Sequence, residues 1–173
     1  LDKRPIGIFD SGVVGLTVAA AIKKLLPNES FVYFGDTRHT PYGDKSASTI
    51  IGYSEAITRF LLKEDCKAIM IACNTASALA YNALLEAFPD IPFINVIDPV
   101  VQHVGGTINN KVGIIATRAT TRSEIYRKRL KRLNPKLHVV SAATPLLVGI
   151  VEENFMNTKV SAGAIEAYLG SKK

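Results

Sequence analysis

The residues with the clearest chemical potential are Cys73 and the two that follow it, Asn74 and Thr75. They come directly after the apolar run 68–72 and open an alanine-rich segment with helical periodicity. This pattern predicts a buried strand that ends in a thiol at the start of a helix. The positive end of a helix dipole favours a thiolate, so Cys73 is a candidate base or nucleophile near neutral pH. The competing interpretation is a structural cysteine, because free cysteines are among the most buried residues.

Other polar residues also follow predicted strands, within turns and at helix starts. Each has an ordinary explanation, since Asp, Ser and Thr commonly cap turns and helices. The carboxyl ends of parallel strands, however, share one edge of a sheet, where α/β proteins bind ligands. The candidate site residues at this edge are Asp10, Ser11, Tyr42, Gly43, Cys73, Asn74, Thr75, Thr117 and Thr120.

The elements that must position these residues alternate along the chain. Strands are predicted at 5–9, 30–34, 67–72, 91–96, 111–116 and 137–142. Helices are predicted at 17–26, 46–63, 75–88, from 99 onward, at 121–133, and in two later segments. Continuous apolar strands alternating with helices indicate an α/β fold, with parallel sheets covered by helices on both faces. We expect two similar, closely packed α/β domains, 1–97 and 98–173.

Composition and charge exclude several classes of protein. The 173 residues are 47% hydrophobic and 21% charged, which is typical of a globular chain. The net charge of +6 is concentrated on the predicted helix 121–133, where Tyr126, Leu130 and Leu133 form an apolar stripe. The basic residues mostly fall on the other faces, as on a solvated amphipathic helix, and no aromatic residues alternate with them. We therefore expect no nucleic-acid partner.

Neither a membrane segment nor a metal site is expected. The apolar runs are too short to span a bilayer, and the N-terminal residues lack the apolar core of a signal peptide. Cys66 and Cys73 make no metal-binding pattern with the scattered His39, His103 and His138. The turn after the first strand is not a dinucleotide fingerprint. A cytoplasmic protein with reduced thiols fits these features best.

Three motifs carry a resemblance to a known family. Asp10-Ser11-Gly12, Pro41-Tyr42-Gly43 and the segment Cys73-Asn74-Thr75-Ala76-Ser77, in this order and spacing, resemble glutamate racemases of the aspartate/glutamate racemase superfamily. The resemblance covers essentially the whole chain. It implies cofactor-independent conversion of L-glutamate to D-glutamate for peptidoglycan synthesis by two-base proton transfer. It also implies an active site in the cleft between two domains, and a homodimer as the candidate assembly of the complete protein.

Matched residue by residue, the resemblance assigns a role to each candidate. Cys73 is expected to be a catalytic acid/base, and Asp10 is expected to bind substrate and assist the proton transfer at Cys73. The resemblance implies substrate binding by Ser11, Tyr42, Gly43, Asn74, Thr75, Thr117 and Thr120. Without a cofactor to accept electrons, hydrogen bonds and orientation must stabilise the charge that develops on the α-carbon.

The chain departs from the family pattern in three places. The family's second catalytic cysteine lies in a Cys-Thr-His motif downstream of Lys173, so we expect an incomplete second domain and an inactive fragment. Cys66 is expected at the opposite edge of the sheet and does not replace it. Val14 stands where the family has glycine, which predicts strain if that position needs a positive φ. Ala116 and Ala119 also replace usual glycines.

Two alternatives remain open from the residues alone. One is a non-catalytic amino-acid-binding or interaction module that lacks half of the catalytic pair. The other is a cysteine hydrolase with Cys73 as nucleophile, for which His39 is the only reasonable partner, although a solvated loop histidine is the simpler interpretation.

Overall fold

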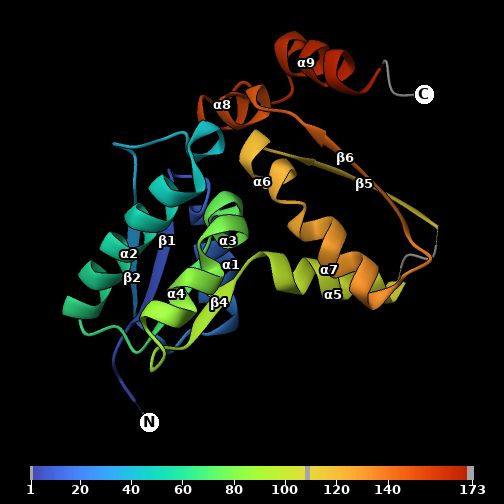
Figure 1. Cartoon of the computed structure of the whole chain (residues 1–173). Coiled ribbons are helices and arrows are strands. Elements are labelled where there is room, and N and C mark those ends of the chain that lie inside the picture. Colours follow the sequence, from blue (N-terminus) through green and yellow to red (C-terminus); the bar gives the residue numbers. More distant parts are fainter. Residues whose placement is uncertain (1, 108–109, 171–173) are drawn as a thin grey trace. The chain divides into compact units, whose positions relative to one another are not determined.

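The chain folds into two compact units, 1–96 and 97–173, each built from alternating strands and helices (Figure 1). The computed structural model describes residues 2–107 and 110–170. Within these ranges every paired strand runs parallel to its neighbour. The predicted α/β class with parallel sheets is therefore confirmed.

Unit 1 contains a four-stranded sheet in the order β2-β1-β3-β4. Its strands are β1 (Ile6–Asp10), β2 (Phe31–Gly35), β3 (Ala68–Ile71) and β4 (Phe93–Asn95). Its helices are α1 (Leu16–Leu25), the 3-10 turn η1 (Tyr42–Asp44), α2 (Ala47–Lys63), α3 (Asn74–Leu79) and α4 (Tyr81–Ala87). Because β1 and β3 are neighbours, the segments that follow them emerge side by side at one edge of the sheet.

The core of unit 1 lies on one face of this sheet. Phe9 of β1 pairs with Ile71 of β3, and Ile69 pairs with Phe93 of β4, so these side chains point to the same face. The helices α2, α3 and α4 contribute the facing side chains of one buried cluster, among them Ile50, Ile57, Leu61, Ala76 and Leu84, and Ala80 joins them from between α3 and α4. Both cysteines and Tyr42 belong to the same cluster. The site residues are therefore supported directly by the core.

Unit 2 contains a two-stranded parallel sheet, β5 (Lys111–Ala116) and β6 (His138–Ala143). Its helices are α5 (Ile97–Thr107), α6 (Arg118–Ser123), α7 (Ile125–Leu133), α8 (Leu146–Glu152) and α9 (Lys159–Leu169). An ion pair between Arg129 and Asp98 joins α7 to α5, so this basic side chain is not simply solvated. Of the predicted stripe on α7, Leu130 is buried but Leu133 is 46% exposed.

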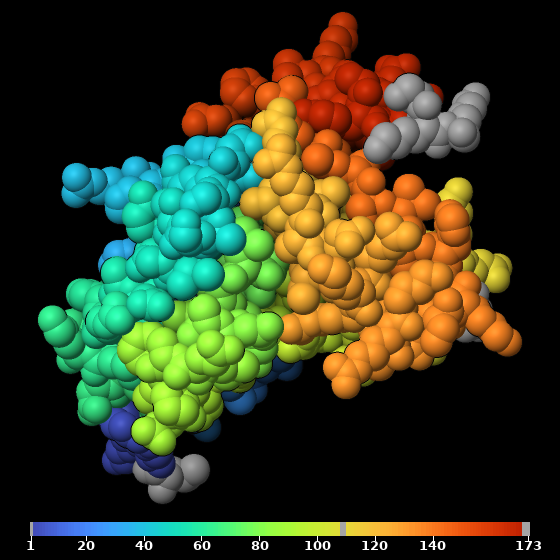
Figure 2. All heavy atoms as spheres, viewed as in Figure 1, coloured from blue at the N-terminus to red at the C-terminus, as the bar shows by residue number. Residues whose placement is uncertain are grey.

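The surface of α8 and α9 is rich in apolar side chains. These helices form the orange-to-red end of the space-filling view (Figure 2). The exposed apolar residues from α8 to α9 are Leu146, Val151, Phe155, Met156, Val160, Ile165 and Leu169. Unit 2 has only two strands in its described residues, and α8 buries none of its residues.

Two helices predicted as continuous are each divided in two. The predicted helix 75–88 is α3 followed by α4, and the predicted helix 121–133 is replaced by α6 and α7. Glu124, between α6 and α7, has a left-handed backbone with φ 55°. The Ser123 hydroxyl donates to the Thr120 carbonyl at 2.7 Å and accepts from the Ile125 N–H at 3.2 Å. These side-chain bonds compete with the regular helical ladder and divide the helix there.

The substitutions at the family's glycine positions leave the backbone unstrained. Within the described ranges, positive φ angles at non-glycine residues occur at Asp65, Glu124, Asn154 and Asn157. Val14, Ala116 and Ala119 are not among them, so the strain considered for Val14 does not arise. In the same ranges, no helix is both long and apolar enough to cross a membrane.

Candidate active site

Cys73 lies at the carboxyl end of β3 and caps the N-terminus of α3. Its Sγ accepts from the Ala76 N–H at 3.5 Å and donates to Ser11 Oγ at 3.5 Å. The residue is only 4% exposed and belongs to the core cluster. The thiol thus faces the loop that follows the neighbouring strand β1, as the edge placement predicts.

The helix dipole is predicted to favour the thiolate of Cys73, whereas the raised pKa of this thiol favours the protonated form. Burial raises the pKa of Cys73 to about 11, and the negative charge of Asp10 adds to this effect. Hydrogen bonds from Ser11 and from the Ala76 N–H act in the opposite direction but are outweighed. Desolvation of the charged form dominates here because the sulfur is enclosed by the core, whereas α3 is only six residues long. At neutral pH Cys73 is therefore a thiol, suited to donating a proton.

Asp10 organises the turn that follows β1. Its Oδ2 accepts from the Gly15 N–H at 2.8 Å and the Gly12 N–H at 3.3 Å, and the residue is 5% exposed. The capping role considered for Asp10 is therefore present. Because Asp10 also raises the pKa of Cys73, its carboxylate helps to keep the thiol protonated.

Tyr42 is held by a carboxylate that the sequence patterns did not select. The Tyr42 hydroxyl donates to Asp36 Oδ2 at 2.6 Å, and His39 Nδ1 lies 2.8 Å from Asp36 Oδ1. The His39 ring stacks on Tyr53, with centroids 4.2 Å apart. Burial and the Asp36 hydrogen bond raise the pKa of Tyr42 well above its usual value. The position of Asp36 directly after β2 was the signal that could have identified it.

The Asp36 cluster also fixes Gly43, since η1 begins at Tyr42. Gly43 is buried, and η1 packs against α3, whose first residues are Asn74 and Thr75. Thr75 is buried and Asn74 is exposed. Unit 1 therefore brings the β1 loop, η1 and the start of α3 to the same edge of its sheet.

Thr117 and Thr120 belong to unit 2 and form their own pair. Thr117 is the N-cap of α6; its Oγ1 accepts from the Thr120 N–H at 3.2 Å and donates to Thr120 Oγ1 at 3.0 Å. Thr120 is 2% exposed. Thr117 therefore has the helix-capping role that was considered for it, and all of these contacts lie within unit 2.

A comparison with known families assigns the chain. Residues 17–169 match the family described as Asp/Glu/Hydantoin racemase. The chain belongs to this family. The family resemblance seen in the sequence is therefore confirmed.

Individual members of the family are close in sequence and in structure. A glutamate racemase of Geobacter metallireducens is 45% identical over 96% of this chain and 62% of its own length. The crystal structure of glutamate racemase from Francisella tularensis in complex with D-glutamate is 40% identical, with a TM-score of 0.92 over 98% of this chain and 64% of that one. The Escherichia coli enzyme in complex with L-glutamate and the activator UDP-MurNAc-ala is 29% identical, with a TM-score of 0.79 over 98% of this chain and 66% of that one. This chain spans about 62% of the length of the curated relatives it matches.

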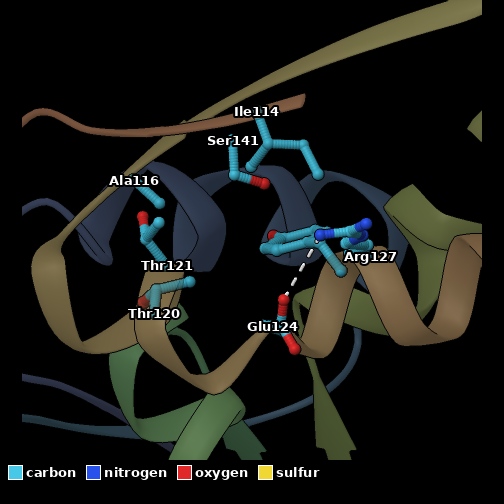
Figure 3. A pocket seen from close by; sticks show the side chains of 8 residues that line it. Ile114, Ala116, Thr120, Thr121, Glu124, Arg127 and Ser141 are labelled. Carbon is cyan, nitrogen blue, oxygen red and sulfur yellow. Dashed lines mark hydrogen bonds and ion pairs between the residues drawn. The ribbon is translucent and has the colours of Figure 1, made fainter. Parts of the chain in front are cut away.

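A small hollow lies within unit 2, and Thr120 is one of its lining residues. It lies between α6, the start of α7 and the two strands, and Arg127 pairs with Glu124 at its rim (Figure 3). The buried Thr121 hydroxyl on this wall has no hydrogen-bond partner in the described part of the chain. The space is sufficient for about one water molecule and is too small for an amino acid.

No metal centre accompanies the Cys73 site in residues 2–107 and 110–170. Over these ranges, no three His, Cys, Asp or Glu side chains lie in an arrangement that could hold a metal ion.

Proposed function

We propose that this chain is the N-terminal part of a glutamate racemase, in which Cys73 transfers a proton to and from the α-carbon. The observation that carries the proposal is the Cys73 thiol, buried beside Ser11 and Asp10 in a chain closely similar to named glutamate racemases. The D-glutamate would serve peptidoglycan synthesis. We propose this activity for the whole protein, because this chain covers 62% of the length of a matching relative.

Racemisation requires two proton-transfer groups on opposite faces of the substrate. One group removes the Cα proton, and the other delivers a proton to the opposite face, so atoms and electrons balance without an external oxidant or reductant. Because the pKa of Cys73 is about 11, its resting form carries the proton that must be delivered. In the reaction direction in which Cys73 donates this proton to the α-carbon, the residue becomes a thiolate. The thiolate regains a proton before or during the next turnover.

Cys66 is a poor candidate for the second group. It precedes β3, whereas Cys73 follows it, so the two thiols lie at opposite ends of one strand. Cys66 is 2% exposed and lies among core atoms around Gly7 and Leu61. We propose that the second base lies in the part of the relatives' length that this chain does not match.

The arrangement around Cys73 supports a proposal for the substrate-binding residues. We propose that Ser11, Gly43, Asn74 and Thr75 hold the carboxylates and the amino group of glutamate, with Asp10 assisting the proton transfer. The Asp36 hydrogen bond holds Tyr42 in place, so this tyrosine contributes by fixing the backbone at Gly43. Thr117 and Thr120 are proposed as the contribution of unit 2.

Two measurements test the proposal. Calorimetry should show that the 173-residue chain binds D- or L-glutamate more tightly than it binds neutral amino acids. Equal affinity for alanine would contradict the substrate assignment. Circular dichroism of glutamate solutions should show racemisation by the whole protein. Cys73→Ala should abolish racemisation and leave binding largely intact, while the matched variant Cys66→Ala should remain active. An active Cys73→Ala protein would disprove the mechanism.

The structure argues against the hydrolase alternative. His39 pairs with Asp36 and stacks on Tyr53, whereas the Cys73 thiol bonds to Ser11 and to the Ala76 N–H. A raised thiol pKa also lowers the fraction of nucleophilic thiolate. NMR in D2O distinguishes the racemase from a binding module without catalysis. If the whole protein is only a binding module, it should bind glutamate but should not exchange the Cα hydrogen of glutamate with solvent deuterium.

A further inference from the structure

Tyr33 is a partly buried residue of β2 that the sequence motifs did not select. It pairs with Ile8 of β1. Two residues further along both strands, Gly35 pairs with Asp10. Its hydroxyl donates to the carbonyl of Gly12 at 3.2 Å, across 21 positions of the sequence. Gly12 follows Ser11 directly, so this bond reaches the loop that contacts the Cys73 thiol.

Two glycines shape the space in which Tyr33 meets the loop. A Cβ at Gly35 would lie 2.5 Å from the Gly12 carbonyl oxygen and 3.3 Å from Tyr33 Cε1. A Cβ at Gly15 would lie 2.9 Å from the Tyr33 hydroxyl oxygen and 2.5 Å from Asp10 Cβ. The loop therefore rests directly on β2 and on the Tyr33 side chain, with no room for a side chain at either glycine.

The loop between β1 and α1 has two side-chain anchors. Asp10 binds the Gly12 and Gly15 N–H groups from inside the turn, and Tyr33 binds the Gly12 carbonyl from the neighbouring strand. Ser11 lies between the anchored residues and places its Oγ 3.5 Å from Cys73 Sγ. Burial and the nearby charge of Asp10 raise the pKa of Tyr33, so its phenol keeps the proton that it donates.

We propose that Tyr33 is a positioning residue that acts through the Gly12 carbonyl to hold Ser11 against the Cys73 thiol. This role rests on the proposed function, in which Ser11 and Cys73 act on the same substrate. The Tyr33 hydroxyl itself touches the loop backbone and is assigned no proton-transfer step.

The test uses Tyr33→Phe in the 173-residue chain, which keeps the ring and removes only the hydroxyl. Alkylation of Cys73 by iodoacetamide, followed by mass spectrometry, reports how often the loop uncovers the thiol. Loss of one ordinary hydrogen bond should accelerate this reaction by about 3- to 10-fold. Cys66 is an internal control, since both cysteines are buried in unit 1. Tyr168→Phe, which removes another backbone-bonded hydroxyl in unit 2, is the matched control.

A double-mutant cycle separates positioning from general loosening of the fold. If Tyr33 acts through Ser11, the acceleration at Cys73 should largely disappear when Tyr33→Phe is made in a Ser11→Ala background. An unchanged Cys73 rate, an equal acceleration at Cys66, or full additivity with Ser11→Ala would each overturn the inference. Protection of wild-type Cys73 by added glutamate tests the proposed function separately, because the Tyr33 comparison is made without glutamate.

Discussion

Gly15 is a position where a single methyl group should be costly. The replacement Gly15→Ala places a Cβ 2.5 Å from Asp10 Cβ and 2.9 Å from both Asp10 Cγ and the Tyr33 hydroxyl oxygen. Ordinary carbon contacts lie at about 3.5–4.0 Å. Neither neighbour is free to yield, because Asp10 binds the Gly15 N–H and Tyr33 binds the Gly12 carbonyl.

The magnitude follows from two opposing contributions. Overpacking of this kind destabilises by about 1–3 kcal/mol. Gly15 has φ −60° and ψ −15°, which alanine adopts freely, so the lower entropy of the unfolded alanine chain returns about 0.4–1 kcal/mol. These ranges differ by about 0–2.6 kcal/mol, and their midpoints give an expected net loss of about 1.3 kcal/mol in the free energy of unfolding. The whole loss is steric, since the backbone conformation itself suits alanine.

Gly52→Ala is the matched control for this steric argument. Gly52 lies within α2, and a Cβ added there would meet nothing within 4 Å, so the same change should stabilise by about 0.8–1 kcal/mol through helix propensity. Urea unfolding is followed by far-UV circular dichroism, because the chain has no tryptophan. Labelling of Cys66 identifies the transition that unfolds unit 1. Equal midpoints for the two alanine variants would refute the close packing derived for the Asp10 loop.

Three further predictions concern the same unit. The folded pKa of Cys73, about 11, exceeds the ordinary thiol value of 9.0, so its contribution to stability is complete below about pH 9 and is lost as the pH rises through 11. The stability difference between wild type and Cys73→Ala should therefore shrink by roughly 2–3 kcal/mol over this range, and a pH-independent difference would contradict the raised pKa. Tyr42→Phe should cost about 1.5–3 kcal/mol in urea unfolding because Asp36 loses a buried donor, whereas Tyr53→Phe should cost less than about 0.5 kcal/mol. Ser54→Ala should raise the thermal midpoint, with a gain of about 1 kcal/mol, because the described chain offers its buried hydroxyl no hydrogen-bond partner; a lower midpoint would show that a partner exists.

The order of the elements was accessible from the sequence because it depends on local patterns. Apolar runs followed by polar residues identified β1 and β3, and Pro5 marked the start of β1. The division of the predicted basic helix at Glu124 was not visible, since no proline or glycine interrupts residues 121–133. That break depends on the Ser123 hydroxyl bonds, which form only once the chain turns there.

The candidate site was partly accessible in the same way. Residue types and spacing selected Cys73, Ser11 and Asp10, and the rule that parallel strands end at one edge predicted that they meet. Asp36 and Tyr33 were missed because neither belongs to a motif. Their importance comes from hydrogen bonds to Tyr42 and to Gly12, which require the turn after β2 and the pairing of β1 with β2.

The sequence by itself determined the fold class, the family resemblance and the identity of the thiol, because these follow from residue types and their order. The protonation state of Cys73 was decided only by the tertiary structure. From the sequence, a helix N-terminus favoured the thiolate. In the fold, burial and the charge of Asp10 outweigh the hydrogen bonds at the sulfur and raise the pKa to about 11. The physical reason is that desolvation and charge proximity depend on which distant segments enclose an atom, and that information exists only after β1 and β3 have packed side by side.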